Sequence, residues 1–427
     1  MANGIMPGTG TREDPFIVED GWDFNALRNI PATTAADVAF IELGADISLA
    51  MFPNFTPIPS RFFNIDGKGH KIRSVSLSMS GSSFGMDVAL FSSLSCTEYI
   101  RNLTVEGMVS VRATGTGSGR VALLAANIRT AGISGSNVVI ENIEAYGSVD
   151  VGSQGSSTTA MLAGGIVAQL NVESSNRATI RNCFFNGVAH CNMTNTATTS
   201  GPTLVFGGIA GRTDLSFNCT AAFDLCISDV GLFVAGTNGV RLGAFGGICG
   251  DCSGPTNSSA ANRIVAFMSS IGKLTINFNN IGSFDRHLIF AGIMGRNDTS
   301  TASSGAAGMT TEIMNCGGFL TINFDPAISP MGVLDFNGLH GQGVRSASAS
   351  SSYVVMEYNN PNGRERPETF NIRGLGSVTA SANVFWDETV LRRTWSGEVA
   401  QPDRGRTTAQ LQSQSFLESQ GWVFANA

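Results

Sequence analysis

The chain has 427 residues, of which 14% are charged and 8% aromatic, and it includes 51 glycines and carries a net charge of −7. Such a low fraction of charged residues excludes a disordered chain, and no stretch reaches the ~20 consecutive apolar residues of a membrane-spanning helix. Because the sequence contains no basic block, we expect neither a nucleic-acid partner nor contact with a membrane.

Residues 1–60 are predicted to form an N-terminal strand and cap. The first residues, MANGIMPGTGTREDPF, include neither a charged n-region nor an apolar h-region, so we expect no Sec-type signal peptide and synthesis in a cytoplasm. Trp22 and Phe24 begin a short apolar cluster. Because the open end of a stack of strands exposes apolar side chains and unpaired edges, we predict that this cluster covers the first coil.

Residues 61–380 contain two phrases that alternate with a period near 40 residues. The first is glycine-rich and reads FGGIAGR at 206–212, FGGICGD at 245–251 and FAGIMGR at 290–296. The second reads IENIEAYGSVDVGS from 140 and IRNCFFNGVAHCNM from 180. Such a period predicts a solenoid, a propeller or an array. Runs of about five residues with alternating apolar side chains indicate strands, and a propeller signature and long amphipathic helices are missing, so a parallel β-helix remains.

The glycines are interpreted as a requirement of shape. With a coil of about 20 residues, the glycine phrase would return once every two coils. We predict that backbones approach so closely at this phrase that only Gly or Ala fits. No Lys-Ser/Thr pair follows the glycines, so they do not form a phosphate-binding loop. The predicted structural glycines are Gly164, Gly165, Gly207, Gly208, Gly211, Gly246, Gly247, Gly250, Gly292 and Gly295.

Residues that could carry chemistry are scattered. Glycosidases need paired carboxyl groups. No two of the acidic candidates occupy equivalent positions in consecutive repeats, so the sequence does not place them side by side. These candidates are Asp285, Asp298, Glu312, Asp335 and Glu357. Cys249 and Cys252 have CxxC spacing, but without a second pair they and the other six cysteines are predicted to be buried free thiols. The four histidines are isolated in sequence, so we expect no metal, no cofactor and no catalytic residue.

Two arginines lie at equivalent positions of the repeat. Arg212 and Arg296 each follow the last glycine of their phrase and therefore share a column. This column is either ordinary surface charge or a contact site for an acidic glycan or for carboxylates of a neighbouring subunit.

Residues 381–427 no longer follow the repeat and are predicted to form a C-terminal cap and an attachment or oligomer-contact segment. Trp386 and Trp395 are the candidate contact residues. Thr407 and Gln410 have capping-box spacing for a helix over TTAQLQSQSFLE. The C-terminal aromatic pair that mirrors the N-terminal one consists of Trp422 and Phe424.

The glycine phrases are followed 15–20 residues later by an I-x-N-C/I segment that ends in Gly-x-Val. Together they resemble the GLUG-type repeats of pectin-lyase-like β-helices in tailed-phage virions and bacterial surface proteins. FNIDGKGHKI at 63–72 is similar to the first coil of such proteins, whereas Gly-Ile replaces their Gly-Leu and regularity is lost after about residue 300. The resemblance implies an all-β, right-handed parallel β-helix solenoid with capping segments at both ends.

The resemblance also implies a function. It points to a non-enzymatic structural protein on the virion surface of a tailed bacteriophage, either a capsid decoration protein or a fibre or spike component, synthesised in the host cytoplasm. Other virion proteins, further copies of the chain in a homo-oligomer, with a trimer favoured, and a host surface glycan are the expected partners. Two alternatives stay open: a phage-borne polysaccharide depolymerase on the same fold, and a bacterial surface adhesin.

Overall fold

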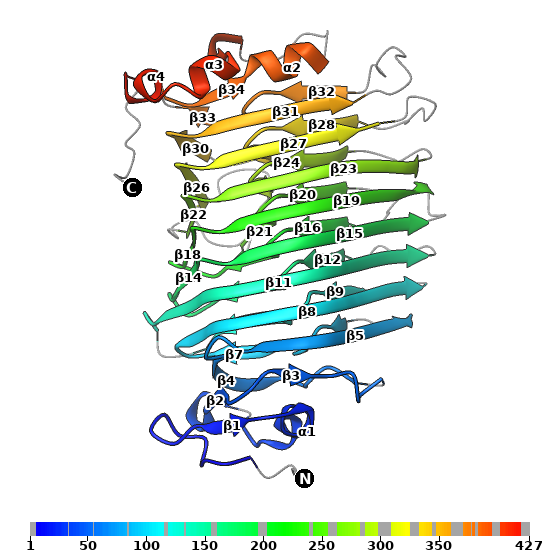
Figure 1. Cartoon of the computed structure of the whole chain (residues 1–427), viewed down its shortest axis with the longest axis vertical. Coiled ribbons are helices and arrows are strands. Elements are labelled where there is room, and N and C mark those ends of the chain that lie inside the picture. The colour runs from blue at the N-terminus through cyan, green and yellow to red at the C-terminus, as the bar shows by residue number, and fades with distance from the viewer. Residues whose placement is uncertain are drawn as a thin grey trace.

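The computed structural model shows a stack of strands with helices at both ends (Figure 1). It describes residues 6–32, 34–53, 55–82, 85–114, 118–131, 134–154, 160–194, 203–238, 242–254, 263–281, 287–297, 309–324, 333–343, 347–359, 370–376, 378–380, 383–394 and 402–419. Predicted residues outside these ranges are Asp285, Asp298, Trp395, Trp422 and Phe424.

Three parallel sheets, here called A, B and C, form the sides of the stack. Sheet C precedes the corner made by each glycine phrase and contains β6 (Met86–Val88), β9 (Gly119–Val121), β12 (Ala160–Gly164), β16 (Thr203–Gly207), β20 (Leu242–Gly246), β24 (His287–Ala291), β28 (Val333–Asn337) and β32 (Phe370–Arg373). Sheet B follows that corner and contains β7 (Leu94–Cys96), β10 (Ala125–Thr130), β13 (Val167–Val172), β17 (Ala210–Leu215), β21 (Cys249–Ser253), β25 (Met294–Asn297) and β29 (His340–Gly343).

Sheet A contains the long strands that face the viewer in Figure 1. Its strands are β1 (Phe16–Val18), β2 (Ala39–Leu43), β3 (Ile47–Ser48), β4 (Arg61–Asp66), β5 (Lys71–Gly81), β8 (Tyr99–Thr114), β11 (Asn137–Gln154), β14 (Arg177–Arg181), β15 (Phe184–Thr194), β18 (Thr220–Asp224), β19 (Ile227–Asn238), β22 (Arg263–Met268), β23 (Ile271–Ile281), β26 (Met309–Met314), β27 (Gly317–Asn323), β30 (Ala347–Ser350), β31 (Tyr353–Asn359), β33 (Thr379–Ala380), β34 (Phe385–Asp387) and β35 (Gly405–Arg406). β4 pairs with both β7 and β8, so it joins sheets A and B.

One coil takes the whole repeat, so the prediction of a coil of about 20 residues is wrong. Between the coil of β12, β13 and β14 and the next one, pairing partners are 43 residues apart in all three sheets, for example Ala160 with Thr203 in sheet C. Other neighbouring coils pair at similar spacings, for example 39 residues between Thr203 and Leu242 and 45 between Leu242 and His287. The reason is the length of the sheet A strands, which reaches 18 residues in β11. In the coils of β8 and β11, runs of residues that look like separate strands in the sequence are parts of one long, bent strand; in the later coils they are two consecutive strands of sheet A, such as β14 and β15.

The bend in sheet A lies at the asparagine of the second phrase. Asn102, Asn142 and Asn182 have φ of 55°, 55° and 49°, a left-handed conformation that asparagine tolerates better than most residues. Their side chains also join the coils, because the amide of Asn142 donates to Asn102 and that of Asn182 to Asn142, both at 2.8 Å. The recurring I-x-N segment therefore forms the corner in these three coils. At the equivalent position of later coils, the same left-handed conformation is adopted by Leu225, Ser269, Asn315 and Ser351.

The glycine phrase forms the corner between sheets C and B. A Cβ atom at any of the ten predicted glycines would lie 1.8–2.6 Å from a backbone carbonyl oxygen. This corner also presses against sheet A: a Cβ on Gly247 would be 2.7 Å from the Cα of Gly272 in β23, and one on Gly292 would be 2.5 Å from the Cα of Gly318 in β27. The coil is thus flattened until two backbones touch.

Stacked side chains fill the rest of the interior. Phe245, Phe290 and Phe336 occupy one register position in sheet C, and their rings stack with centroid distances of 4.7 and 5.3 Å. The prediction for the cysteines is confirmed, because all eight are buried free thiols. Burial raises the pKa of Cys96 to about 12, so its thiol stays protonated.

The N-terminal end is closed by α1 (Gly21–Ala26) and two short 3₁₀ helices, Leu27–Asn29 and Ala35–Asp37. Phe24 is 1% exposed and packs on Phe55 and Phe91, with ring centroids 5.9 and 5.8 Å away. Trp22 differs, because its side chain is 57% exposed. Only one member of the predicted aromatic pair therefore covers the first coil.

The other end is covered by α2 (Glu388–Thr394), a 3₁₀ helix at Pro402–Arg404, α3 (Thr408–Leu411) and α4 (Gln414–Ser419) (Figure 1). The capping box of Thr407 and Gln410 is confirmed, but the single helix expected after it is interrupted between α3 and α4. Trp386 is 2% exposed and packs over Gly374, so its ring is covered by this chain itself, and its contact with a partner stays a prediction. The segment limits at residues 60 and 380 stay predictions.

Candidate functional site

Polar side chains form two columns along one face of sheet B. Gln169, Arg212, Asp251 and Arg296 occupy equivalent positions in β13, β17, β21 and β25. Asn171, Asp214 and Ser253 form the second column, two residues further along each strand. Because side chains alternate along a strand, both columns lie on the same face, and neighbours in a column are about 4.8 Å apart.

The exposed part of this face centres on Asp214. Nε of Arg212 donates to Oδ1 of Asp214 at 2.8 Å, and the amide of Gln169 donates to Oδ2 at 2.5 Å. The hydroxyl of Ser253 also donates to Oδ1 and accepts from Arg212. Three neighbouring donors on three strands therefore hold this carboxylate in a fixed orientation.

The next part of the same column is a buried ion pair. Arg296 donates from Nη2 to Oδ2 of Asp251 at 2.9 Å, and the two side chains are 12% and 1% exposed. Burial raises the pKa of Asp251, against the attraction of Arg296 and Arg212, which lowers it. Arg212 and Arg296 do share a column, as predicted, but an aspartate of the same chain lies between them.

A groove lies beside the exposed part of this face. Its volume is about 330 Å³, within the range of ligand sites. The residues that line it are Asn171, Glu173, Arg212, Asp214, Leu215, Ser216, Ser253 and Gly254. Glu173 forms an ion pair with Arg129 at 3.0 Å. The groove therefore offers two carboxylates, a guanidinium group and a hydroxyl group, a set of donors and acceptors that suits a polar ligand such as a sugar.

The acidic candidates from the sequence are not gathered in this groove. Within the described residues, Glu312 lies in β26 and Glu357 in β31, both in sheet A, and Asp335 lies in β28 of sheet C. Asp335 accepts a hydrogen bond from Asn371 at 2.8 Å. The sequence reasoning missed the aspartate between the two arginines, although the final letters of FGGIAGR, FGGICGD and FAGIMGR name three consecutive members of that column.

The paired cysteines form no reactive site. Sγ of Cys249 lies 3.7 Å from Sγ of Cys252, both are fully buried, and burial raises the pKa of Cys252. Over the ranges given above, the structure contains no cluster of three His, Cys, Asp or Glu side chains that could hold a metal ion. In the same part of the chain, no helix is long and apolar enough to cross a membrane.

Known proteins resemble this chain in fold and not in sequence. No family model matches the sequence, and no curated protein is similar to it. The fold is similar to a crystal structure described as a "putative immunoglobulin A1 protease" from Bacteroides ovatus, with 14% identity and a TM-score of 0.43 over 88% of this chain and 86% of that one.

Proposed function

We propose that this chain is a non-enzymatic structural protein exposed on the virion of a tailed bacteriophage, as a capsid decoration protein or a fibre or spike component. In this proposal the solenoid is a right-handed parallel β-helix, made in the host cytoplasm. The observation that carries the proposal is the continuous pairing of sheet C from β6 to β32, which makes one long stack with covered ends. Such a stack presents a large lateral surface for assembly.

The polar side chains on the outside of the stack support a passive role. The Asn102–Asn142–Asn182 ladder and the Asp251–Arg296 pair each join neighbouring coils. Bonds of this kind use polar groups to hold the stack together, as a scaffold on a particle surface requires.

The outer face of sheet A supports association with other proteins. Phe184, Ile227 and Ile271 occupy one register position in β15, β19 and β23, and the two isoleucines are 41% and 37% exposed. Apolar side chains aligned across coils are typical of an interface. We therefore propose that other copies of the chain, as a trimer, or other virion proteins cover this column.

The proposal is tested on phage particles from the source of the sequence. Quantitative mass spectrometry and density mapping of purified particles are expected to show many copies fixed to the capsid or the tail. Particles made without this protein should lose the corresponding density and keep the rest of their composition. Absence of the protein from intact particles, or unaltered density in particles made without it, would refute the proposal.

A second candidate function is a polysaccharide depolymerase. The observation that favours it is the groove on sheet B, where Glu173 and Asp214 come from neighbouring coils and line the same cavity as Arg212. Two carboxyl groups that flank a glycosidic bond are the usual requirement for its hydrolysis. Against it, Asp214 already accepts bonds from several donors of its own chain.

Incubation of the purified protein with host surface polysaccharide distinguishes the two functions. The structural proposal expects no new reducing or unsaturated ends. Cleavage that is lost in Asp214→Asn but retained in Asp229→Asn, an exposed aspartate of sheet A paired with Lys273, would favour the enzyme.

A further inference from the structure

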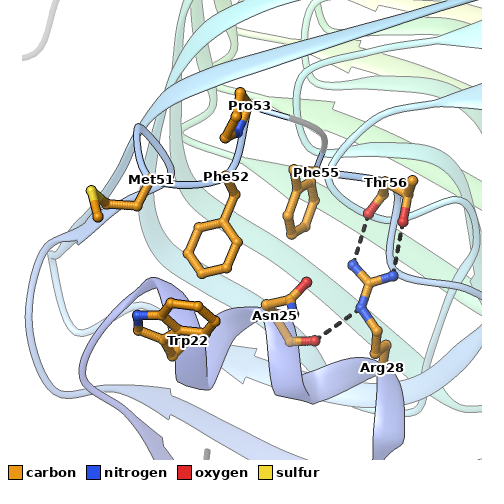
Figure 2. A pocket seen from close by; sticks show the side chains of 8 residues that line it. All are labelled: Trp22, Asn25, Arg28, Met51, Phe52, Pro53, Phe55 and Thr56. Atoms are coloured by element: carbon orange, nitrogen blue, oxygen red, sulfur yellow. Dashed lines mark hydrogen bonds between the residues drawn. The ribbon is translucent and has the colours of Figure 1, made fainter. Parts of the chain in front are cut away.

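The N-terminal cap contains a second cavity, of about 460 Å³, far along the stack from the C-terminal helices (Figure 1). It lies between α1 and the segment that leads to β4 (Figure 2). The residues that line it are Trp22, Asn25, Arg28, Met51, Phe52, Pro53, Phe55 and Thr56. Neither the polar columns of sheet B nor the corner glycines contribute to it.

Aromatic rings form one side of this cap pocket. Trp22 is 57% exposed and meets the ring of Phe52 edge-on, with centroids 4.8 Å apart at 71°. The backbone at Trp22 is held at the start of α1, because Asp20, the residue that caps α1, accepts a hydrogen bond from the backbone N–H of Trp22 at 2.8 Å. The exposed indole beside Phe52 offers an apolar face and a polar N–H to a ligand.

Arg28 forms the opposite side, as Figure 2 shows. Its Nε donates to the backbone oxygen of Asn25 at 3.0 Å, and its Nη1 and Nη2 donate to Oγ1 and the backbone oxygen of Thr56 at 2.9 and 3.0 Å. A guanidinium group has five N–H donors. Three of them fix the orientation of Arg28, so two remain for a ligand.

The charge near the pocket is unbalanced. Arg61 donates to the backbone oxygen of Arg28, so two guanidinium groups lie close together. Burial, and then the positive charge of Arg61, lower the pKa of Arg28. In the described ranges, neither arginine forms an ion pair with a carboxylate. An anion bound at Arg28 would therefore gain a charge-assisted hydrogen bond and relieve this repulsion.

We propose that the cap pocket binds one acidic pyranose residue of a polysaccharide. The apolar face of the sugar ring would lie against Trp22, its carboxylate would accept from one of the two remaining N–H groups of Arg28, and the side-chain amide of Asn25 would bind a hydroxyl group. This combination of an aromatic ring, a guanidinium group and an amide matches a ligand with a flat C–H face, hydroxyl groups and one negative charge. The inference is independent of the virion proposal.

The test compares the binding of methyl glucuronide and methyl glucoside, two sugars of which only the former carries a carboxylate. Binding to the purified full chain is measured by saturation-transfer NMR and by fluorescence titration. We expect the glucuronide to bind about tenfold more tightly, the contribution of one hydrogen bond between charged groups. Arg28→Gln should remove this preference. Trp22→Ala should weaken the binding of both sugars about fivefold, the effect of losing one aromatic contact.

Two matched variants control for charge and for exposed aromatic area. Arg12→Gln removes another arginine of the cap, one that pairs with Glu98 and lies over Phe40. Phe217→Ala removes an exposed ring, 46% exposed, elsewhere on the stack. Both should bind the two sugars as the unmodified protein does.

Three results would overturn the inference. The first is that the unmodified protein binds neither sugar. The second is that Arg28→Gln keeps the preference for the glucuronide or that Trp22→Ala keeps both affinities. The third is that a carboxylate-bearing peptide binds the pocket more tightly than either sugar, which would assign it to a protein partner. Because Arg28→Gln also removes bonds to Thr56, thermal unfolding of each variant is measured alongside, and Trp22→Ala provides an independent result.

Discussion

Replacing Gly247 with alanine tests whether the glycine phrase is a requirement of shape. The new Cβ atom would lie 1.9 Å from the carbonyl oxygen of Gly292 in the next coil and 2.7 Å from the Cα of Gly272 across the interior. Ordinary contacts between such atoms need roughly 3.5 Å, so the backbones would have to separate by more than about 1 Å. Backbone cannot rotate away as a side chain can.

The expected loss is therefore large. Overpacking a well-filled interior usually costs 1–3 kcal/mol, and here both obstacles are backbone, so we expect the free energy of unfolding to fall by about 3 kcal/mol or more. Gly231 is the matched control, because it lies in a neighbouring strand of sheet A and a Cβ there would have its nearest neighbour at 3.7 Å. Gly231→Ala should change the free energy by less than about 1 kcal/mol, and restriction of the unfolded chain favours a gain.

Urea unfolding followed by circular dichroism measures both variants. Because stacked repeats can lose cooperativity, hydrogen exchange with mass spectrometry should show whether the loss is concentrated in the coils around Gly247. Equal unfolding midpoints for Gly247→Ala and Gly231→Ala would refute the reasoning, since only the former places an atom against two backbones.

Three further predictions concern buried groups. The eight buried cysteines should not react with Ellman's reagent at pH 8 in the folded chain, and all eight should react in denaturant. Asp251→Ala removes the carboxylate that faces buried Arg296 and should cost about 3 kcal/mol in urea unfolding, most of it recovered in Asp251→Ala/Arg296→Met. Burial lowers the pKa of His340 from 6.5 to about 4. Because the unfolded chain takes up the proton first, stability should fall by about 3 kcal/mol between these pH values, and His340→Gln should show a smaller fall.

The repeat unit of the fold is predictable from the sequence, but the length of the coil is not. Alternating apolar residues indicate strands whether or not two runs belong to one strand. The decision depends on the left-handed residue between the runs: at Asn142 the strand of sheet A bends without ending, whereas at Asn182 it is interrupted between β14 and β15, and both strands still pair with β11. A left-handed residue between two alternating runs is equally typical of a turn between separate strands, so the sequence pattern alone does not distinguish one long coil from two short ones.

The candidate sites differ in how far the sequence reveals them. The column of Arg212, Asp251 and Arg296 is visible as the last letter of each glycine phrase, because parallel coils keep their register. The cap pocket has no such signal, since α1 and residues 51–56 meet only in the folded chain. From the sequence we expect Trp22 to cover the first coil and Trp386 to contact a partner, but Trp22 is exposed and Trp386 is buried. This outcome likewise depends on which segment covers each end of the stack.

The flattened coil explains why we expect binding sites to lie away from the glycine corners of the repeat. The corner between sheets C and B reaches across the interior and touches sheet A, and at Gly247 and Gly292 only glycine permits that contact. Gly247 and its equivalents are therefore constrained by neighbours in two directions, and a change there disturbs several coils. Trp22 of the cap pocket is 57% exposed and lacks this constraint. We therefore expect Trp22→Ala to change the proposed sugar binding while the stack keeps its register, so that binding at the cap is separable from the fold.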